Sequence, residues 1–317
     1  MSPNPVKRRS VNGILLLDKP LDLTSSQAMS RAKGIFRAQK AGHTGSLDPK
    51  ATGLLPVCFG EATKFSSFFL EGDKTYTASA KLGVRTSTQD TEGEVIAKRE
   101  VGDHAARLEE VLARFTGKIE QVPSRYSAIK VDGRPLYKYA RAGQEVRVPK
   151  RTVEIYSIML TKRDGDTFEI VVRCSKGTYI RTLIDDIGQE LGCGAHLTAL
   201  RRNDVQGLPS SPLHTLTELQ QIADTQCHDG VWSALDSLLL PIETALSSLP
   251  RISLPHDTAR RLSQGLEQDL DEKQIDFNRE LVWEKAVCLE CDGRFIGIVR
   301  FEGSRVRPVR MMSEPPL

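Results

Sequence analysis

Apolar and polar positions alternate along this chain with two periods, one typical of strands and the other of helices. The apolar run Ile14 to Leu17 predicts a buried strand that ends at Asp18, Lys19 and Pro20. From Thr75 to Val84 the period is two, which predicts a second strand. Its apolar face consists of Tyr76, Ala78, Ala80 and Leu82.

Three segments have the spacing of helices. Thr24 and Ser25 can cap a first helix that runs through Ala32 and ends near Gly34. A second helix follows Asp103, with an apolar stripe of Leu108, Val111, Leu112 and Phe115 and with Gly117 after its end. A third helix follows the predicted strand Phe168 to Cys174 and ends at Gly192. Its buried stripe consists of Ile180, Leu183, Ile184, Ile187 and Leu191.

Strands and helices alternate without the regular spacing of a doubly wound sheet, so we expect an α+β fold with a mixed sheet. Residues 205–250 are rich in Ser, Pro and Leu and are expected to wrap this domain or link it onward. Beyond them, two apolar segments flank Asp292-Gly293, a pair suited to a type I′ hairpin turn. The sequence therefore predicts two domains, residues 1–250 and a small, mostly β domain of residues 251–317.

The composition supports a soluble globular protein. Of 317 residues, 39% are hydrophobic and 27% are charged, which argues against a disordered or coiled-coil chain. No apolar run approaches the roughly 18 residues of a membrane span, and the N-terminus has no apolar segment after its basic cluster. Six scattered cysteines indicate a reducing compartment, so we expect a cytoplasmic protein. For the C-x-x-C pair Cys288 and Cys291, ordinary strand residues are favoured over a zinc site.

The net charge of +3 is distributed unevenly. Residues 125–151 contain eight basic and two acidic side chains, and residues 294–310 contain five arginines and one glutamate. Residues 215–280 contain twelve acidic and five basic side chains. The two positive segments would attract a polyanion, although a charge run is more often a solvated face. The basic segment has weak periodicity and is expected to leave the core as an excursion.

The chain lacks the nucleotide-binding, dinucleotide-binding and zinc-protease motifs, as well as the G-x-S-x-G motif. The segment with the most potential for chemistry is the loop Gly42 to Gly53, where small residues surround Asp48 and His43. Taken alone, Asp48 before Pro49 is more typical of a helix N-cap than of a catalytic acid. His43 alone is more typical of a solvated loop residue, and no third ligand for a metal is near.

Residues 41–55, AGHTGSLDPKATGLL, resemble the catalytic motif of the TruB family of tRNA pseudouridine synthases. Four more segments resemble that family's motifs in the same order. They are LLLDKP with Thr24-Ser25, residues 74–93, residues 127–141 and residues 174–202. The C-terminal hairpin region resembles the PUA-type RNA-binding domain of bacterial members. The resemblance implies a pseudouridine synthase catalytic domain with a basic RNA-binding insertion at about residues 124–152.

The resemblance also implies an activity, the isomerisation of uridine to pseudouridine at position 55 in the T loop of tRNA. The base would be flipped out of the RNA, its bond from N1 to the ribose would break, and a bond from C5 would form. Asp48 matches the family's nucleophile, which would need a nearby cation, and Arg181 matches the residue that supplies it. Tyr76 would stack on the uracil and is the candidate for proton handling at C5. Without the resemblance, Arg181 would be read as a helix residue paired with Asp185, and Tyr76 as a core aromatic.

Further residues match positions that bind the substrate. Tyr179 and Leu200 would line the uridine pocket, although Leu200 alone resembles a core leucine, and His43 would fill the gap left by the flipped base. Lys19, Lys64 and Asp90 match positions that support the site or face the RNA. Lys130, Lys138 and Arg141 of the insertion would contact phosphates of the T arm.

Such an isomerisation consumes nothing, so no cofactor or metal is expected. Attack by Asp48 on C1′ of the ribose, attack on C6 of the base and removal of the 2′ proton all stay open. The partner is tRNA, and a monomer is the default expectation. The alternative function is a tRNA-binding or tRNA-folding protein whose role does not require catalysis; a synthase that acts on another RNA is a third possibility.

Overall fold

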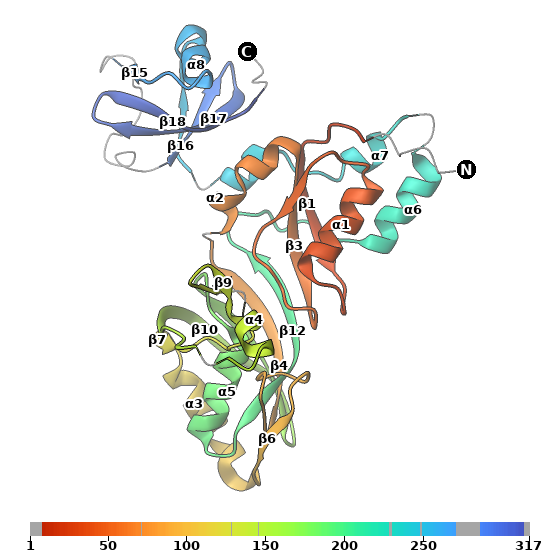
Figure 1. The fold of residues 1–317 in the computed structure, drawn as a ribbon, viewed down its shortest axis with the longest axis vertical. Helices are drawn as coiled ribbons and strands as arrows, with labels where there is room; N and C mark the ends of the chain where they lie inside the picture. Colours follow the sequence, from red (N-terminus) through yellow and green to blue (C-terminus); the bar gives the residue numbers. More distant parts are fainter. Residues whose placement is uncertain are drawn as a thin grey trace.

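The computed structural model describes residues 8–70, 72–127, 129–144, 146–227, 230–247, 249–270 and 286–313. Within these ranges, nine strands form one long mixed sheet that carries the larger part of the molecule (Figure 1). In sheet order they are β13 (His214–Thr215), β1 (Gly13–Lys19), β3 (Ala51–Phe59), β12 (Ala195–Val205), β4 (Lys74–Leu82), β11 (Thr167–Cys174), β10 (Arg151–Asp164) and β7 (Gly117–Gln121), and β2 (Ala41–His43) pairs with β3. The pairs β1–β13 and β3–β12 are parallel and the other pairs are antiparallel, so the predicted mixed sheet is confirmed.

The two ends of this sheet have separate hydrophobic cores. Helices α1 (Ser25–Ile35) and α6 (Leu216–Gln226) pack at the β1–β3 end. Helices α3 (Leu108–Arg114) and α5 (Ile180–Leu191) pack at the other end, against β4, β10 and β12. Strand β1 is buried on both faces, which explains why its sequence is an uninterrupted apolar run. Strand β12 pairs with both β3 and β4 and so joins the two ends.

The helix predicted after the strand Phe168 to Cys174 is confirmed as α5. All five residues of its predicted stripe are buried, and the helix ends where Gly192 adopts a left-handed conformation with φ of 95°. The predicted helix at Thr24 is also confirmed, since the Thr24 side chain accepts a hydrogen bond from the backbone N–H of Gln27.

Other segments differ from the expectation. The strand predicted from Thr75 to Val84 is divided at Gly83, whose φ of 81° turns the chain between β4 and β5 (Val84–Thr86), which pairs with β6 (Val95–Lys98). The helix predicted after Asp103 begins as the 3₁₀ helix η2 (Gly102–Arg107), and only α3 is α-helical. The expected Gly-rich loop contains the short strand β2.

Residues 205–250 do wrap the larger sheet, but they do so with structure that was not predicted. Besides α6, they form α7 (Ser233–Asp236) and the 3₁₀ helix η3 (Ile242–Leu246). Thr215 caps α6 together with Glu218 in a capping box. The basic excursion between β7 and β10 is present and contains a small hairpin of β8 (Lys130–Val131) and β9 (Arg134–Pro135) followed by α4 (Leu136–Arg141).

A second sheet lies at the C-terminal end of the chain (Figure 1). Its described strands, in sheet order, are β14 (Arg251–Ser253), β16 (Ala286–Cys291), β17 (Arg294–Glu302), β18 (Arg305–Met311) and β15 (Gln268–Asp269). Helix α8 (His256–Ser263) packs on this sheet. Asp292 and Gly293 have φ of 49° and 72°, as a type I′ turn requires, so the predicted hairpin is confirmed. Cys288 and Cys291 are buried strand residues.

The second sheet packs directly on the first part of the chain. The rings of Phe65 and Phe295 meet edge to face at 5.2 Å, and Cys288 and Ile298 belong to the same hydrophobic cluster as Ile14. On the side of the larger sheet, the contact includes Ala62, Phe65 and Phe69. These residues lie in or between two short helices, η1 (Gly60–Lys64) and α2 (Ser66–Leu70). No helix in the described ranges is long and apolar enough to cross a membrane.

Gly53 provides a test of this packing. It has φ of 96°, and a Cβ there would collide with the backbone of Arg202 on β12. We predict that Gly53→Ala lowers the free energy of unfolding by about 3 kcal/mol. Gly34→Ala is the matched control, because nothing lies within 4 Å of its Cβ position and α1 gains a better helix former. It should stabilise by about 0.5–1 kcal/mol in the same urea titrations. Equal effects of the two substitutions would contradict this account.

Candidate active site

The loop that carries Asp48 is held by backbone contacts on both sides. The Ser25 hydroxyl, at the start of α1, donates to the Leu47 carbonyl at 3.0 Å and accepts from the Leu47 N–H at 2.8 Å. The Ala51 N–H donates to the Asp48 carbonyl at 3.0 Å and closes a tight turn that leads into β3. Asp48 therefore precedes a turn and a strand, and the N-cap interpretation of Asp48 is wrong.

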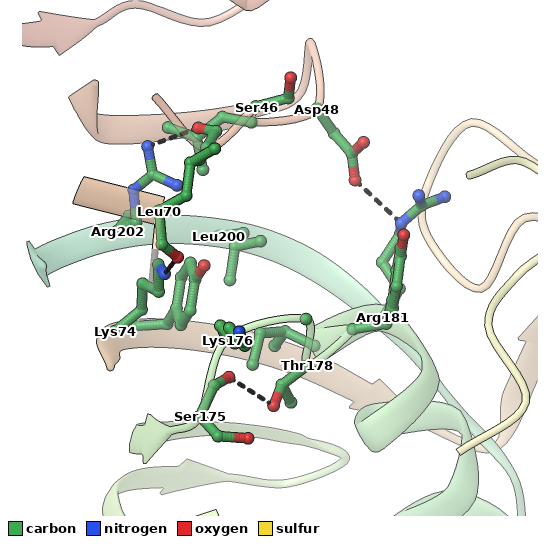
Figure 2. Close-up of a pocket in the computed structure, with 16 residues that line it drawn as sticks. Ser46, Asp48, Leu70, Lys74, Ser175, Lys176, Thr178, Arg181, Leu200 and Arg202 are labelled. Carbon is green, nitrogen blue, oxygen red and sulfur yellow. Dashed lines mark hydrogen bonds and ion pairs between the residues drawn. The ribbon is translucent and has the colours of Figure 1, made fainter. Parts of the chain in front are cut away.

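A cavity of about 240 Å³ opens beside this loop (Figure 2). Five residues of the predicted set line it. They are Asp48, Tyr76, Tyr179, Arg181 and Leu200. They come from the loop, from β4, from the start of α5 and from β12, so segments far apart in the sequence meet here. The volume is several times the roughly 30 Å³ of a water molecule, which leaves room for a small planar group.

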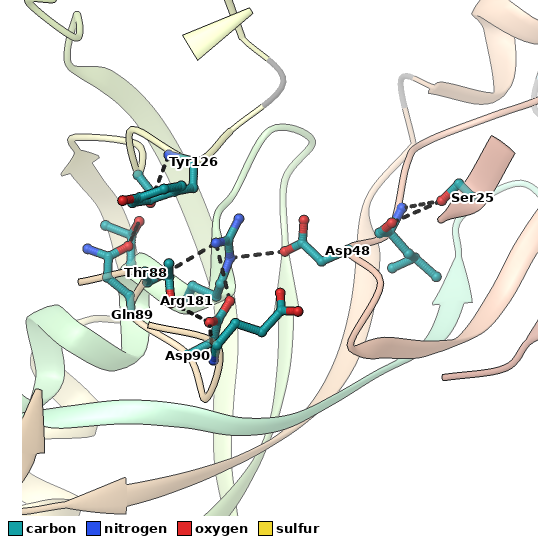
Figure 3. A network of polar contacts seen from close by, with 11 residues as sticks. Ser25, Asp48, Thr88, Gln89, Asp90, Tyr126 and Arg181 are labelled. Carbon is teal, nitrogen blue, oxygen red and sulfur yellow. Dashed lines mark hydrogen bonds and ion pairs between the residues drawn. The ribbon is translucent and has the colours of Figure 1, made fainter. Parts of the chain in front are cut away.

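Arg181 is the central charge of the site (Figure 3). Its Nε lies 3.0 Å from Oδ2 of Asp48, and its Nη1 lies 3.3 Å from Oδ2 of Asp90 and donates to the Thr88 carbonyl at 3.2 Å. Only 7% of the Arg181 side chain is exposed, against 45% for Asp48. The carboxylate of Asp48 thus faces the cavity while its cation is buried behind it.

The alternative pairing of Arg181 with Asp185 is wrong. Asp185 accepts two hydrogen bonds from Arg85 instead, at 2.8 and 2.9 Å. Asp90 lies behind Arg181 and also accepts from the N–H of Glu92 at 3.0 Å. Asp90 is therefore a buried support for Arg181 and does not line the cavity of Figure 2.

The surroundings of Asp48 raise the pKa of its carboxyl group. Removal from water by the walls of the site is the main cause, even though one side of the group is open to the cavity. The positive charge of Arg181 opposes this effect, Asp90 reinforces it, and Lys19 opposes it more weakly. The result is a carboxylate that is more basic than an exposed aspartate, next to a fixed cation, which suits a nucleophile or a base.

Lys19 does not face the cavity. It is completely buried, and its ammonium group donates to the carbonyls of Pro20, Leu23 and Pro49 at 2.8, 2.7 and 3.2 Å. Burial lowers the pKa of Lys19 to about 8, while the carboxylates of Asp48 and Asp22 oppose that shift. Lys19 therefore supports the turn that follows Asp48 from behind.

The aromatic residues are held by the strands and by the start of α5. Tyr76 on β4 lies directly across from Arg202 on β12, and burial raises the pKa of its hydroxyl. Tyr179 precedes α5, and its backbone is fixed by the buried side chain of Gln121, which donates to the Tyr179 carbonyl at 3.2 Å and accepts from its N–H at 3.0 Å. Leu200 lies across from Ala78 on the same face of the sheet.

The other residues of the predicted set lie away from the cavity. His43 ends β2, and its Nδ1 is buried without a hydrogen-bond partner among the described residues; burial and the nearby Arg202 lower the pKa of His43. Lys64 donates to the Met311 carbonyl at 3.2 Å and to the Ser313 hydroxyl at 2.6 Å, so it joins the two parts of the chain.

The predicted residues of the basic insertion also lie away from the cavity. Lys138 is exposed on α4. Lys130 and Arg141 belong to β8 and α4, and their side chains lie outside the described residues.

Three residues around the site, Arg202, Gln121 and Ser25, were not predicted from the sequence as parts of it. Arg202 is two positions after Leu200 on one strand, so the period of two would have placed it on the same face. No sequence signal identified Gln121, because its role depends on two hydrogen bonds to the backbone of Tyr179, which lies 58 residues later in the chain. Within the described residues, no cluster of His, Cys, Asp and Glu has the arrangement of a metal site.

Comparison with known proteins gives a consistent result. Residues 33–180 match the family model of the TruB family pseudouridylate synthase N-terminal domain, and residues 181–247 match that of the tRNA pseudouridylate synthase B C-terminal domain. The tRNA pseudouridine synthase B of Vibrio campbellii is 48% identical over 82% of this chain and 83% of its own length. The protein of the same name from Ralstonia pickettii is 45% identical over 98% of both chains.

Solved structures show the same fold. An H/ACA RNP bound to a substrate RNA containing 2′-deoxyuridine includes a chain with a TM-score of 0.71 and 25% identity, covering 95% of this chain and 84% of that one. A chain of an archaeal box H/ACA sRNP Nop10-Cbf5 complex has the same TM-score and identity, covering 99% of this chain and 89% of that one.

The buried ammonium of Lys19 gives a pH dependence that can be measured. Its pKa is about 8 in the folded protein and 10.5 ordinarily, so between these pH values the unfolded chain binds more protons. The free energy of unfolding of the native protein should therefore rise, relative to Lys19→Met, as the pH increases from about 8 to about 10.5. Urea titrations at a series of pH values check this.

Lys50→Met is the matched control for Lys19. The exposed ammonium of Lys50 hydrogen-bonds to Asp22, which raises the pKa of Lys50. Its contribution should be lost, not gained, as the pH rises through that raised pKa. The same sign for both lysines would contradict the assignment.

Proposed function

The chain belongs to the TruB family of pseudouridylate synthases, and from this premise we propose that it converts uridine to pseudouridine in the T loop of tRNA, at position 55. The choice of tRNA rests on the names of its relatives, which are tRNA pseudouridine synthases B over nearly the full length of this chain. The observation that carries the assignment of the site is the ion pair of Asp48 and Arg181 at the rim of the cavity that Tyr76 also lines.

The cavity accepts the target uridine after it leaves the stack of the RNA. An enzyme that acts on an atom inside a stacked helix must flip the base out, at a cost of a few kcal/mol. In our proposal the ring of Tyr76 stacks on the uracil, and Leu200 and Tyr179 enclose it. His43 fills the gap that the base leaves in the RNA; its position in β2, next to the Asp48 loop, is consistent with this role.

Asp48 acts as the nucleophile. In the reaction the bond from N1 to C1′ breaks and a bond from C5 to C1′ forms. The hydrogen at C5 leaves as a proton and N1 gains a proton, so that the product is an isomer of the substrate. Arg181 keeps the Asp48 carboxylate ionised against the effect of its surroundings, which raise its pKa. The proposal leaves open attack of Asp48 on C1′, its attack on C6 and its removal of the 2′ proton.

The RNA outside the pocket meets the positive segments of the chain. The insertion carries a net charge of +6, from eight basic and two acidic residues, and lies between β7 and β10, next to Gln121 and thus next to Tyr179. We propose that residues 1–250 are the catalytic domain and that residues 251–317 form a PUA-like RNA-binding domain. Lys130, Lys138 and Arg141 contact phosphates of the T arm in this scheme. A role in tRNA folding that does not need catalysis is the alternative, and it can coexist with the enzyme.

The first test compares Asp48→Asn with the native protein. Tritium release from C5 of [5-³H]uridine in an unmodified tRNA transcript measures turnover. We expect release by the native protein, no release by Asp48→Asn and unchanged tRNA binding by both, because the amide keeps the shape but loses the nucleophile. Asp22→Asn is the control, because Asp22 is exposed, pairs with Lys50 and does not line the cavity. Release by Asp48→Asn would remove Asp48 from its role, and no release by the native protein would favour the alternative.

The second test concerns the insertion. Reversal of the charges at Lys130, Lys138 and Arg141 should weaken tRNA binding and reduce the slope of log K against log salt by about 2–3, since each phosphate contact contributes about 0.7–0.9. Reversal at Lys162 and Arg163, exposed residues of β10 outside the insertion, serves as the control. An unchanged slope in the first variant would mean that the insertion does not contact phosphate.

A further inference from the structure

The start of helix α5 is fixed by a side chain from a distant part of the chain. Gln121, the last residue of β7, is only 1% exposed. Its side-chain amide donates to the Tyr179 carbonyl at 3.2 Å and accepts from the Tyr179 N–H at 3.0 Å. The peptide groups on both sides of the Tyr179 Cα are thus held. This sets the direction in which the Tyr179 side chain, which lines the cavity, leaves the backbone.

This contact takes the place of a capping box that α5 lacks. In α1 and α6 the third helical residue, Gln27 or Glu218, accepts from the backbone N–H of the capping residue. In α5 the capping residue is Tyr179, whose side chain makes no capping hydrogen bond, and the third helical residue is Thr182, whose hydroxyl makes its hydrogen bond elsewhere. Gln121 therefore accepts the hydrogen bond that a local residue accepts in the other two helices.

Gln121 also lies at the base of the basic insertion. The chain leaves the sheet after Gln121 to form the insertion and returns at Arg151, the first residue of β10, and these two residues are direct partners in the β7–β10 pair (Figure 1). Glu154 on β10 accepts from the Ser175 N–H through its backbone carbonyl at 2.8 Å, and its N–H donates to the Ser175 hydroxyl at 2.9 Å. Both strands that carry the insertion therefore hold the segment that leads into α5.

This segment forms one wall of the cavity. Ser175, Thr178 and Tyr179 line it, and the Thr178 hydroxyl donates to the Ser175 carbonyl at 2.9 Å (Figure 2). Arg181, two residues after Tyr179, holds Asp48 from within α5. A shift of the start of α5 would thus move two groups of the proposed mechanism, the side chain that encloses the uracil and the cation beside the nucleophile.

We propose that Gln121 is a positioning residue of this site, which fixes the start of α5 so that Tyr179 and Arg181 keep the orientation required for turnover. This proposal rests on the proposed function. Gln121 does not line the cavity and touches no reacting atom; it acts through the backbone of Tyr179. A positioning role predicts a slower reaction with RNA binding retained, whereas a purely structural role predicts a smaller amount of folded protein.

The test compares Gln121→Met with the native protein in single-turnover tritium release from the labelled tRNA transcript, with the protein in saturating excess. Methionine has a similar length but lacks the N–H donor and the carbonyl acceptor of the amide. We expect the rate constant to fall by about 100-fold, as small displacements of positioning groups do, and the tRNA affinity to stay unchanged. Gln189→Met is the matched control, because Gln189 is exposed on the same helix and does not line the cavity. It should react at the native rate.

Hydrogen exchange of the backbone amides separates positioning from stability. In Gln121→Met we expect the exchange rate of the Tyr179 amide to rise by a larger factor than the rates of Ile184 and Ile187 in the middle of α5. An equal factor along the helix would mean that Gln121 only stabilises the fold, and so would a smaller reacting fraction with a native rate constant. Either result would overturn the proposal.

If Gln121→Met does not fold, Gln121→Glu takes its place, with Gln189→Glu as its control. Glutamate keeps the shape and the acceptor for the Tyr179 N–H, but an ionised carboxylate cannot donate to the Tyr179 carbonyl. We expect its rate constant to be lower by about tenfold, the effect of one hydrogen bond. A native rate constant in Gln121→Met, or in Gln121→Glu where the first variant does not fold, would overturn the positioning role. Absence of tritium release by the native protein would instead overturn the proposed function.

Discussion

The whole site depends on the burial of one guanidinium group. Arg181 occupies the second position of α5, where the partial positive charge of the helix N-terminus makes a cation unfavourable. It is almost fully removed from water, so it needs negative partners close by. Asp90 supplies one from inside the structure and Asp48 supplies the other from the cavity side. A buried cation between two carboxylates thus determines where Asp48 lies, because Asp48 has one face that must stay with Arg181 and one that is free.

The sheet brings these groups together from distant parts of the chain. Asp48 enters from the β1–β3 end, while Arg181 and Tyr76 belong to the β4–β11 end, and each end has its own core. Strand β12 crosses between them and carries Leu200 and Arg202 at the junction. Stability and chemistry are thereby divided. The cores can be packed for stability, and the polar groups that would weaken a core are collected where the two ends meet.

The parts of this structure that follow local rules could be predicted from the sequence. The face of β4, the stripe and end of α5, the capped start of α1 and the turn at Asp292-Gly293 all depend on residues that are close in the sequence. The partner of Arg181 could not be found in this way. Local spacing suggested Asp185 as the partner, but Asp185 pairs with Arg85, which lies one hundred residues earlier in the chain. For Lys19 the sequence left open whether it supports the site or faces the RNA, because the sequence cannot show that three carbonyls surround its ammonium group. Helix α6 was missed because its apolar residues are sparse and its burial comes from packing on α1.

The contact between the two sheets has a consequence for how the chain can be divided. Judged by strand pairing, residues after 250 are a separate unit, but Cys288, Phe295 and Ile298 complete a hydrophobic cluster that Ile14 and Phe65 begin. A chain cut between the two would leave that cluster half uncovered, and the apolar surface so exposed is of the kind that drives self-association. The C-terminal unit therefore covers part of the hydrophobic core of its neighbour. For this reason it cannot be removed or exchanged as an independent module.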